Sequence, residues 1–131
     1  MGTRCVRTGL LAVALLTACS ASAVESTTLQ LRELNSSGVT GTVTLTGVGS
    51  ERTRIEIEVS PAGNPSMPAH IHPGTCDDLV PQPKYALENV LSGVSVTEVA
   101  VPIGELLADR VALNIHRSNS ELDVYTACVD L

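Results

Sequence analysis

The three histidines of this chain are the residues whose type and spacing could hold a metal ion. His70 and His72 are two positions apart, and His116 is the only other histidine in the sequence. Side chains two positions apart on a β-strand point to the same face of a sheet. The sequence therefore predicts that His70 and His72 present their imidazoles together on one face of a strand.

The residues before His116 indicate where its imidazole points. Every second position of a predicted strand over residues 110–116 is aliphatic, namely Val111, Leu113 and Ile115. These residues mark the core face, so Ala112, Asn114 and His116 are predicted to face outward. All three histidines are thus expected on the outer surface of the domain, where they converge on one ion.

Three imidazoles without a thiolate favour copper or zinc over calcium or magnesium, and the affinity order of nitrogen sites favours copper. Structural zinc normally has a fourth protein ligand, and none is obvious in the sequence. The acidic residues near the histidines in sequence are expected to be solvated rather than ligating; they are Asp77, Asp78, Glu121 and Asp123. The simpler alternative is three unrelated surface histidines, which is the commoner meaning of an isolated His-x-His.

Two cysteines support the grouping of the histidines. Cys76 and Cys128 follow the two histidine segments, and an even pair of cysteines in an oxidising compartment predicts a disulfide. Bonded cysteines have their Cα atoms within about 7 Å. The bridge would therefore hold the two histidine strands near each other.

The elements that must position these residues are predicted to be strands. Aliphatic and polar residues alternate over residues 39–46 and again over residues 54–59, with a turn at residues 47–50, which predicts a hairpin. A first strand is expected around Leu29 and Leu31, and residues 61–68 are too rich in proline for a helix or a central strand. Further expected elements are strands over residues 69–72, 94–101, 110–116 and 124–129 and a short helix over residues 103–108.

Composition and spacing together predict an all-β fold with one core. The chain has no Phe or Trp and only two Tyr, so aliphatic residues must fill the interior. Strands at this spacing favour a sandwich or barrel, and we expect about 7–8 antiparallel strands in a Greek-key β-sandwich or flattened barrel over residues 24–131. The residues expected to share the core are Val43, Leu45, Ile55, Ile57, Val59, Val111, Leu113 and Ile115.

The first 23 residues are predicted to be a secretory signal peptide, because Arg4 and Arg7 precede a short apolar stretch and then small polar residues. Two cleavage sites compete. Residues 16–19 match a lipobox, which we prefer and which would make Cys19 a lipidated N-terminus, whereas residues 21–23 match an ordinary cleavage site. The protein is therefore expected to be periplasmic or at the cell surface if lipid-anchored, and otherwise secreted.

Charge argues against nucleic acid as a partner. The whole chain has a formal charge of −6, and removing residues 1–23 takes away Arg4 and Arg7 and no acidic residue, which leaves −8. Such a domain repels phosphate backbones. Membrane contact is expected only through an N-terminal lipid.

Three segments together resemble the copper half of copper/zinc superoxide dismutases: AHIHPGTC at residues 69–76, VALNIH at residues 111–116 and TAC at residues 126–128. The resemblance covers residues 39–131 and implies a superoxide dismutase-like sandwich. It also implies that His70, His72 and His116 are copper ligands and that Cys76 and Cys128 are bonded. The same segments are similar to short secreted CHRD-type domains, for which no catalytic activity can be transferred.

The chain also departs from the dismutase pattern. Residues 77–93 contain no histidine, so neither the metal-bridging histidine nor a zinc site is implied. Tyr125 stands where the family has its active-site arginine. We therefore expect a copper-binding protein that holds the ion or exchanges it with a donor or acceptor protein. A copper-only superoxide dismutase and a non-catalytic structural or interaction domain are the alternatives.

Overall fold

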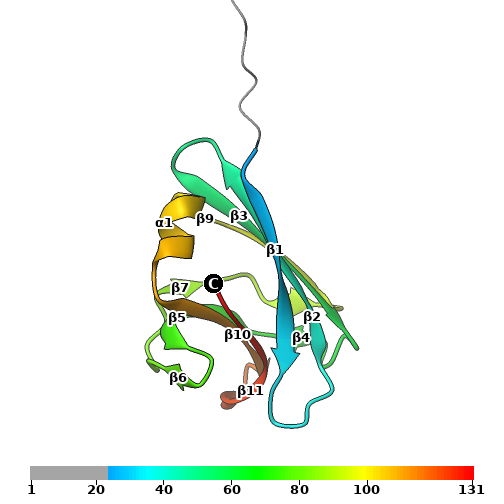
Figure 1. Ribbon diagram of the computed structural model, residues 1–131. Coiled ribbons are helices and arrows are strands. Elements are labelled where there is room, and N and C mark those ends of the chain that lie inside the picture. The colour runs from blue at the N-terminus through cyan, green and yellow to red at the C-terminus, as the bar shows by residue number, and fades with distance from the viewer. Residues whose placement is uncertain (1–23) are drawn as a thin grey trace, which may run out of the picture.

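The structure is a computed structural model that describes residues 24–131. The predicted signal peptide and the predicted lipidation of Cys19 lie outside these residues. The described chain forms eleven strands and one short helix (Figure 1). The strands are β1 Ser26–Glu33, β2 Thr40–Val48, β3 Arg52–Ser60, β4 Ser66–Met67, β5 Ala69–Thr75, β6 Asp78–Leu79, β7 Tyr85–Ala86, β8 Val90–Leu91, β9 Val94–Val99, β10 Val111–Ser118 and β11 Glu121–Asp130, and the helix is α1 Ile103–Ala108.

The strands form one curled antiparallel sheet rather than two separate sheets. The order along the sheet is β4-β8-β9-β3-β2-β1-β11-β10-β5-β6, and β7 pairs with β5. β1 joins the two halves, because Ser26 to Leu31 pair with β2 whereas Arg32 and Glu33 pair with β11. Figure 1 shows the resulting half-barrel. The predicted all-β flattened barrel is confirmed, with seven strands of six or more residues.

Aliphatic side chains fill the space inside the curled sheet, as the alternation predicts. β2 and β3 pair in register, so that Val43 lies opposite Ile57 and Leu45 opposite Ile55. These four side chains are fully buried, and the aliphatic residues of β10 are at most 3% exposed. Val59 alone of the predicted core set is half-buried, because its partner on β2 is Gly41, which has no side chain to cover it.

The helix α1 lies at the predicted residues and covers one edge of the core. It begins after Pro102, whose fixed φ suits the start of a helix, and it buries Ile103 and Leu106. No helix within residues 24–131 is long and apolar enough to cross a membrane.

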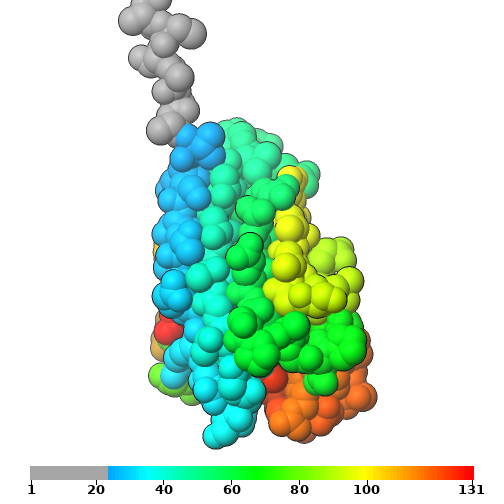
Figure 2. Space-filling model, turned by 90° about the vertical axis from the view of Figure 1, so that its right-hand side faces the viewer, coloured from blue at the N-terminus to red at the C-terminus, as the bar shows by residue number. Residues whose placement is uncertain are grey.

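The outer face of β1 and β2 carries hydroxyl groups. Cross-strand pairs join Ser26 to Thr46 and Thr28 to Thr44 at 3.2 and 2.9 Å between their side-chain oxygens. Figure 2 views this side of the molecule and shows β1, β2, β3 and β9 lying next to one another. The polar half of the predicted alternation therefore faces solvent here.

Candidate metal centre

Three neighbouring strand positions place the histidines on one face of the sheet. β5 and β10 are antiparallel neighbours in which His72 lies opposite Ala112 and His70 lies opposite Asn114. Paired residues share a face, and so do residues two apart on one strand. His116, two residues after Asn114, therefore lies on the same face as the other two histidines.

The three imidazoles converge, as the sequence predicts. One ring nitrogen from each of His70, His72 and His116 lies within 4.8 Å of the other two. The ring centroid of His70 lies 5.6 Å from that of His72 and 4.8 Å from that of His116. No other group of three or more His, Cys, Asp or Glu side chains within residues 24–131 has this arrangement.

The expectation that the histidines lie exposed on the surface is wrong. His72 and His116 are 2% and 3% exposed, and His70 is partly buried. Ala112 and Asn114, also expected to face water, are fully buried. All five residues lie on the predicted face of the sheet, but residues 80–84 and the start of β11 cover that face.

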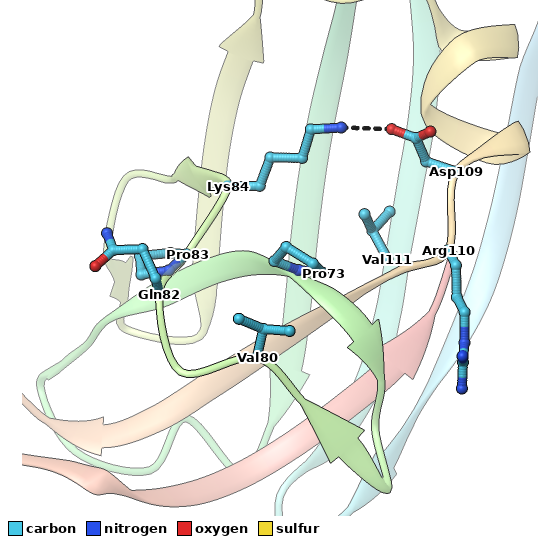
Figure 3. A pocket seen from close by; sticks show the side chains of 8 residues that line it. All are labelled: Pro73, Val80, Gln82, Pro83, Lys84, Asp109, Arg110 and Val111. Carbon is cyan, nitrogen blue, oxygen red and sulfur yellow. Dashed lines mark hydrogen bonds and ion pairs between the residues drawn. The ribbon is translucent and has the colours of Figure 1, made fainter.

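Residues 80–84 are anchored to the sheet at both ends. The backbone N–H of Val80 donates to Pro73, and that of Lys84 donates to Ile71. The Lys84 ammonium also donates to Asp109 at 2.5 Å, and Figure 3 shows this contact. Lys84 and Asp109 also line a hollow of about 470 Å³, together with Val80, Gln82 and Pro83, and no histidine within residues 24–131 lines this hollow. Residues 80–84, which cover the histidines, are thus fixed in place by hydrogen bonds to the sheet and to Asp109.

Two backbone carbonyls orient two of the imidazoles. The Nδ1 atom of His72 lies 2.8 Å from the carbonyl oxygen of Val80, and the Nδ1 atom of His116 lies 2.6 Å from that of Leu122. A carbonyl oxygen only accepts, so each Nδ1 carries a proton and, in the neutral ring, each Nε2 keeps a lone pair. These carbonyls therefore leave both Nε2 lone pairs unused.

The Nε2 atoms of His72 and His116 differ in their hydrogen-bond partners. The Nε2 atom of His72 is buried and has no hydrogen-bond partner. The Nε2 atom of His116 lies 2.8 Å from the Nδ1 atom of His70. Because the Nδ1 atom of His116 carries the proton, its Nε2 atom accepts this bond from the Nδ1–H group of His70. An ion bound by these two nitrogens would therefore replace the hydrogen bond and would require the proton of His70 to lie on its Nε2 atom.

Burial favours the neutral form of His70 and His116. It lowers the pKa of His70, and a positive charge on His72 would lower it further. Burial also lowers the pKa of His116; the carbonyl of Leu122 opposes this shift, and charges on the other two histidines reinforce it. Neutral imidazoles are the form that binds metal.

The histidines line a hollow of about 460 Å³ whose other walls are mostly apolar. Its remaining lining residues are Pro81, Pro83, Leu122, Asp123 and Tyr125. The Tyr125 ring stands edge-on to His116 with 5.1 Å between their centroids. Among residues 24–131, no Lys or Arg lines this hollow, and Asp123 is the only one of the four nearby acidic residues that does.

The predicted disulfide is confirmed, but it does not by itself bring the histidine strands together. Cys76 and Cys128 are bonded with 5.9 Å between their Cα atoms. β5 and β10 already pair directly, and Cys128 lies on β11, on the other side of β10. The bridge therefore clamps the end of β5 to β11 across the strand that carries His116.

Sequence reasoning missed the residues that support the histidines. Val80 and Leu122 act through backbone carbonyls, which any residue could supply, so their residue types give no signal. Asn114 was expected in water and is instead buried beside the cluster. The pattern of alternation correctly predicted its face but contained no sign of the segment that covers it.

No protein-family model, curated protein or solved structure matches this chain. The interpretation of the site therefore depends on its own geometry and chemistry.

Proposed function

We propose that this chain is an exported copper-binding protein that holds or delivers a copper ion through His70, His72 and His116. The observation that carries the proposal is the buried Nε2 atom of His72, which has no partner although its ring is fixed by Val80. A buried nitrogen without a partner costs about 1–3 kcal/mol. An ion bound by the three nitrogens would remove that cost.

The donor set fits copper better than other ions. Three nitrogen donors disfavour calcium and magnesium, which prefer oxygen ligands, and copper heads the affinity order at such sites. Zinc is the less favoured alternative, because no fourth His, Cys, Asp or Glu joins the cluster within residues 24–131. The resemblance of the three histidine and cysteine segments to copper/zinc superoxide dismutases also supports copper.

The lining of the hollow favours binding over superoxide chemistry. Superoxide is an anion, and a cation near the metal would attract it. In the described part of the chain no Lys or Arg lines this hollow, and Asp123 lies there instead. A copper-only superoxide dismutase is the second candidate, because the hollow leaves space beside the three nitrogens for a small molecule. A CHRD-type structural or interaction domain is the third candidate, and it would bind no metal.

The proposal also includes export of the protein from the cytoplasm. The expected signal peptide in residues 1–23 and the disulfide both fit an oxidising compartment. A lipid on Cys19 would be the only membrane contact. The partner of such a protein would be a copper donor or acceptor protein, and the net charge of −8 without residues 1–23 argues against nucleic acid.

Metal analysis of the purified protein tests this function. We expect one copper per chain in the unmodified protein, little in His70→Ala, and an unchanged amount in Asp78→Asn, which alters an exposed acid outside the cluster. Equal metal content in the unmodified protein and His70→Ala would contradict the proposal. A superoxide assay on the copper-loaded protein then separates binding, with no turnover, from the dismutase alternative.

A further inference from the structure

Asn114 lies beside the three-histidine cluster, on the same face of β5 and β10. Its cross-strand partner on β5 is His70, and His72 is the diagonal neighbour, because it pairs with Ala112. Side chains in these two relations are within reach of each other. His116 is two residues further along β10 and shares the face. The partner of Asn114 on β11 is the disulfide-bonded Cys128. The Asn114 side chain therefore lies between His70 and Cys128, on the face of the sheet that carries the three imidazoles.

The amide of Asn114 is fully buried and has no partner. Its exposed fraction is 0%, and neither Oδ1 nor Nδ2 makes a hydrogen bond. Within residues 24–131 only one other buried side-chain nitrogen or oxygen lacks a partner, and it is the Nε2 atom of His72. All the unsatisfied buried side-chain atoms of the described chain thus belong to this one face of β5 and β10.

Resting on the copper-binding function above, we propose that the amide oxygen of Asn114 is the fourth protein ligand of the metal ion. Buried polar groups in proteins are nearly always paired. A cation between the imidazoles would pair the Nε2 atom of His72 and the Oδ1 atom of Asn114 at once, leaving, of these two residues, only the Nδ2 atom of Asn114 without a partner. The oxygen is the amide atom with free lone pairs, and a side-chain amide oxygen is a weak copper ligand in sites that also hold the ion by two imidazoles and a thiolate. The site would then be three nitrogens and one oxygen.

Two substitutions of opposite chemistry test this role. Asn114→Leu removes the oxygen at similar size, and Asn114→Asp replaces it with a charged one. Cu(II) titration and electron paramagnetic resonance spectra of the loaded proteins are the readouts. For Asn114→Leu we expect copper affinity about tenfold lower, an altered copper hyperfine splitting, and a melting temperature without metal that is no lower than that of the unmodified protein. For Asn114→Asp we expect affinity about tenfold higher, because a carboxylate is a stronger donor.

Thr53→Val is the matched control, since Thr53 is also fully buried but lies on β3 and donates to Val101. It should lower stability and leave the affinity and the spectrum unchanged. An Asn114→Leu protein with the affinity and spectrum of the unmodified protein would overturn the inference, and so would an Asn114→Asp protein that binds no more tightly. If Asn114→Asp does not fold, Asn114→Leu decides alone. Failure of the copper-binding function is distinguishable, because the unmodified protein would then bind copper no better than His70→Ala.

Discussion

At the scale of single residues, the orientation of the His72 imidazole is fixed by a backbone acceptor. Its Nδ1 donates to the carbonyl of Val80, while its Nε2 faces the cluster without a partner. Such hydrogen bonds fix the tautomer and the ring orientation of metal-binding histidines. The ring therefore needs little reorganisation when an ion arrives.

The burial of His72 predicts that its substitution costs stability as well as metal. His72→Ala removes a buried ring and leaves the carbonyl of Val80 without its donor, so the free energy of unfolding should fall by about 1–3 kcal/mol. His70→Ala should cost less, because His70 is only partly buried. Urea unfolding of the metal-free proteins measures both values. Equal stability of His72→Ala and the unmodified protein would show that the ring is not packed as described.

The lowered pKa values of His70 and His116 predict how stability depends on pH. In the unfolded chain a histidine titrates near its ordinary pKa of about 6.5, whereas burial lowers the pKa of these two in the folded protein. Below about pH 6.5 the unfolded chain therefore binds more protons, and the free energy of unfolding must fall as the pH drops. Urea unfolding of the metal-free protein between pH 8 and pH 5 tests this. The fall should be smaller in His116→Ala, and an equal fall in both would contradict the assignment.

At the scale of elements, the long strands and the short helix could be predicted from the sequence, but the cover over the site could not. Alternation of aliphatic and polar residues gave the faces of β2, β3 and β10 correctly, because one face of each strand packs in the core. Four strands of two residues were not predicted, since such segments are too short to show a period. Residues 80–84 cover the histidine face through backbone hydrogen bonds, which do not depend on residue type.

Two glycines should respond to alanine in opposite directions. A Cβ at Gly41 would lie 1.9 Å from the carbonyl oxygen of Glu58 on β3, so Gly41→Ala must push β2 and β3 apart. We expect it to lower the free energy of unfolding by about 2 kcal/mol or more. A Cβ at Gly104 in α1 would meet no atom within 4 Å, and Gly104→Ala should stabilise by about 0.5–1 kcal/mol. Thermal unfolding measures both, and a stabilising Gly41→Ala would mean that the pairing of β2 with β3 is wrong.

At the scale of the whole molecule, the disulfide closes a large part of the chain. Cys76 and Cys128 are 52 residues apart, and bonding them restricts the unfolded chain. In the chain-entropy model a loop of this length contributes roughly 4 kcal/mol. The bond also lies beside the site, because Cys128 is the β11 partner of Asn114.

Replacing both Cys76 and Cys128 with alanine should therefore lower the free energy of unfolding by roughly 4 kcal/mol and weaken copper binding. Denaturant unfolding and copper titration of the double variant measure the two effects. Non-reducing peptide mapping of the unmodified protein should show the Cys76–Cys128 link and no link to Cys19. A fragment joining Cys19 to either cysteine would contradict both the predicted processing and the bridge.

The most direct test of copper binding by the three histidines is electron paramagnetic resonance of the Cu(II)-loaded protein. Nitrogen nuclei bonded to Cu(II) split its signal, so the spectrum counts the imidazoles at the ion. The geometry of His70, His72 and His116 predicts one bound copper with three nitrogen ligands, and the loss of this signal in the triple alanine variant. A spectrum without nitrogen coupling, or one that the triple variant retains, would show that these histidines do not hold the metal.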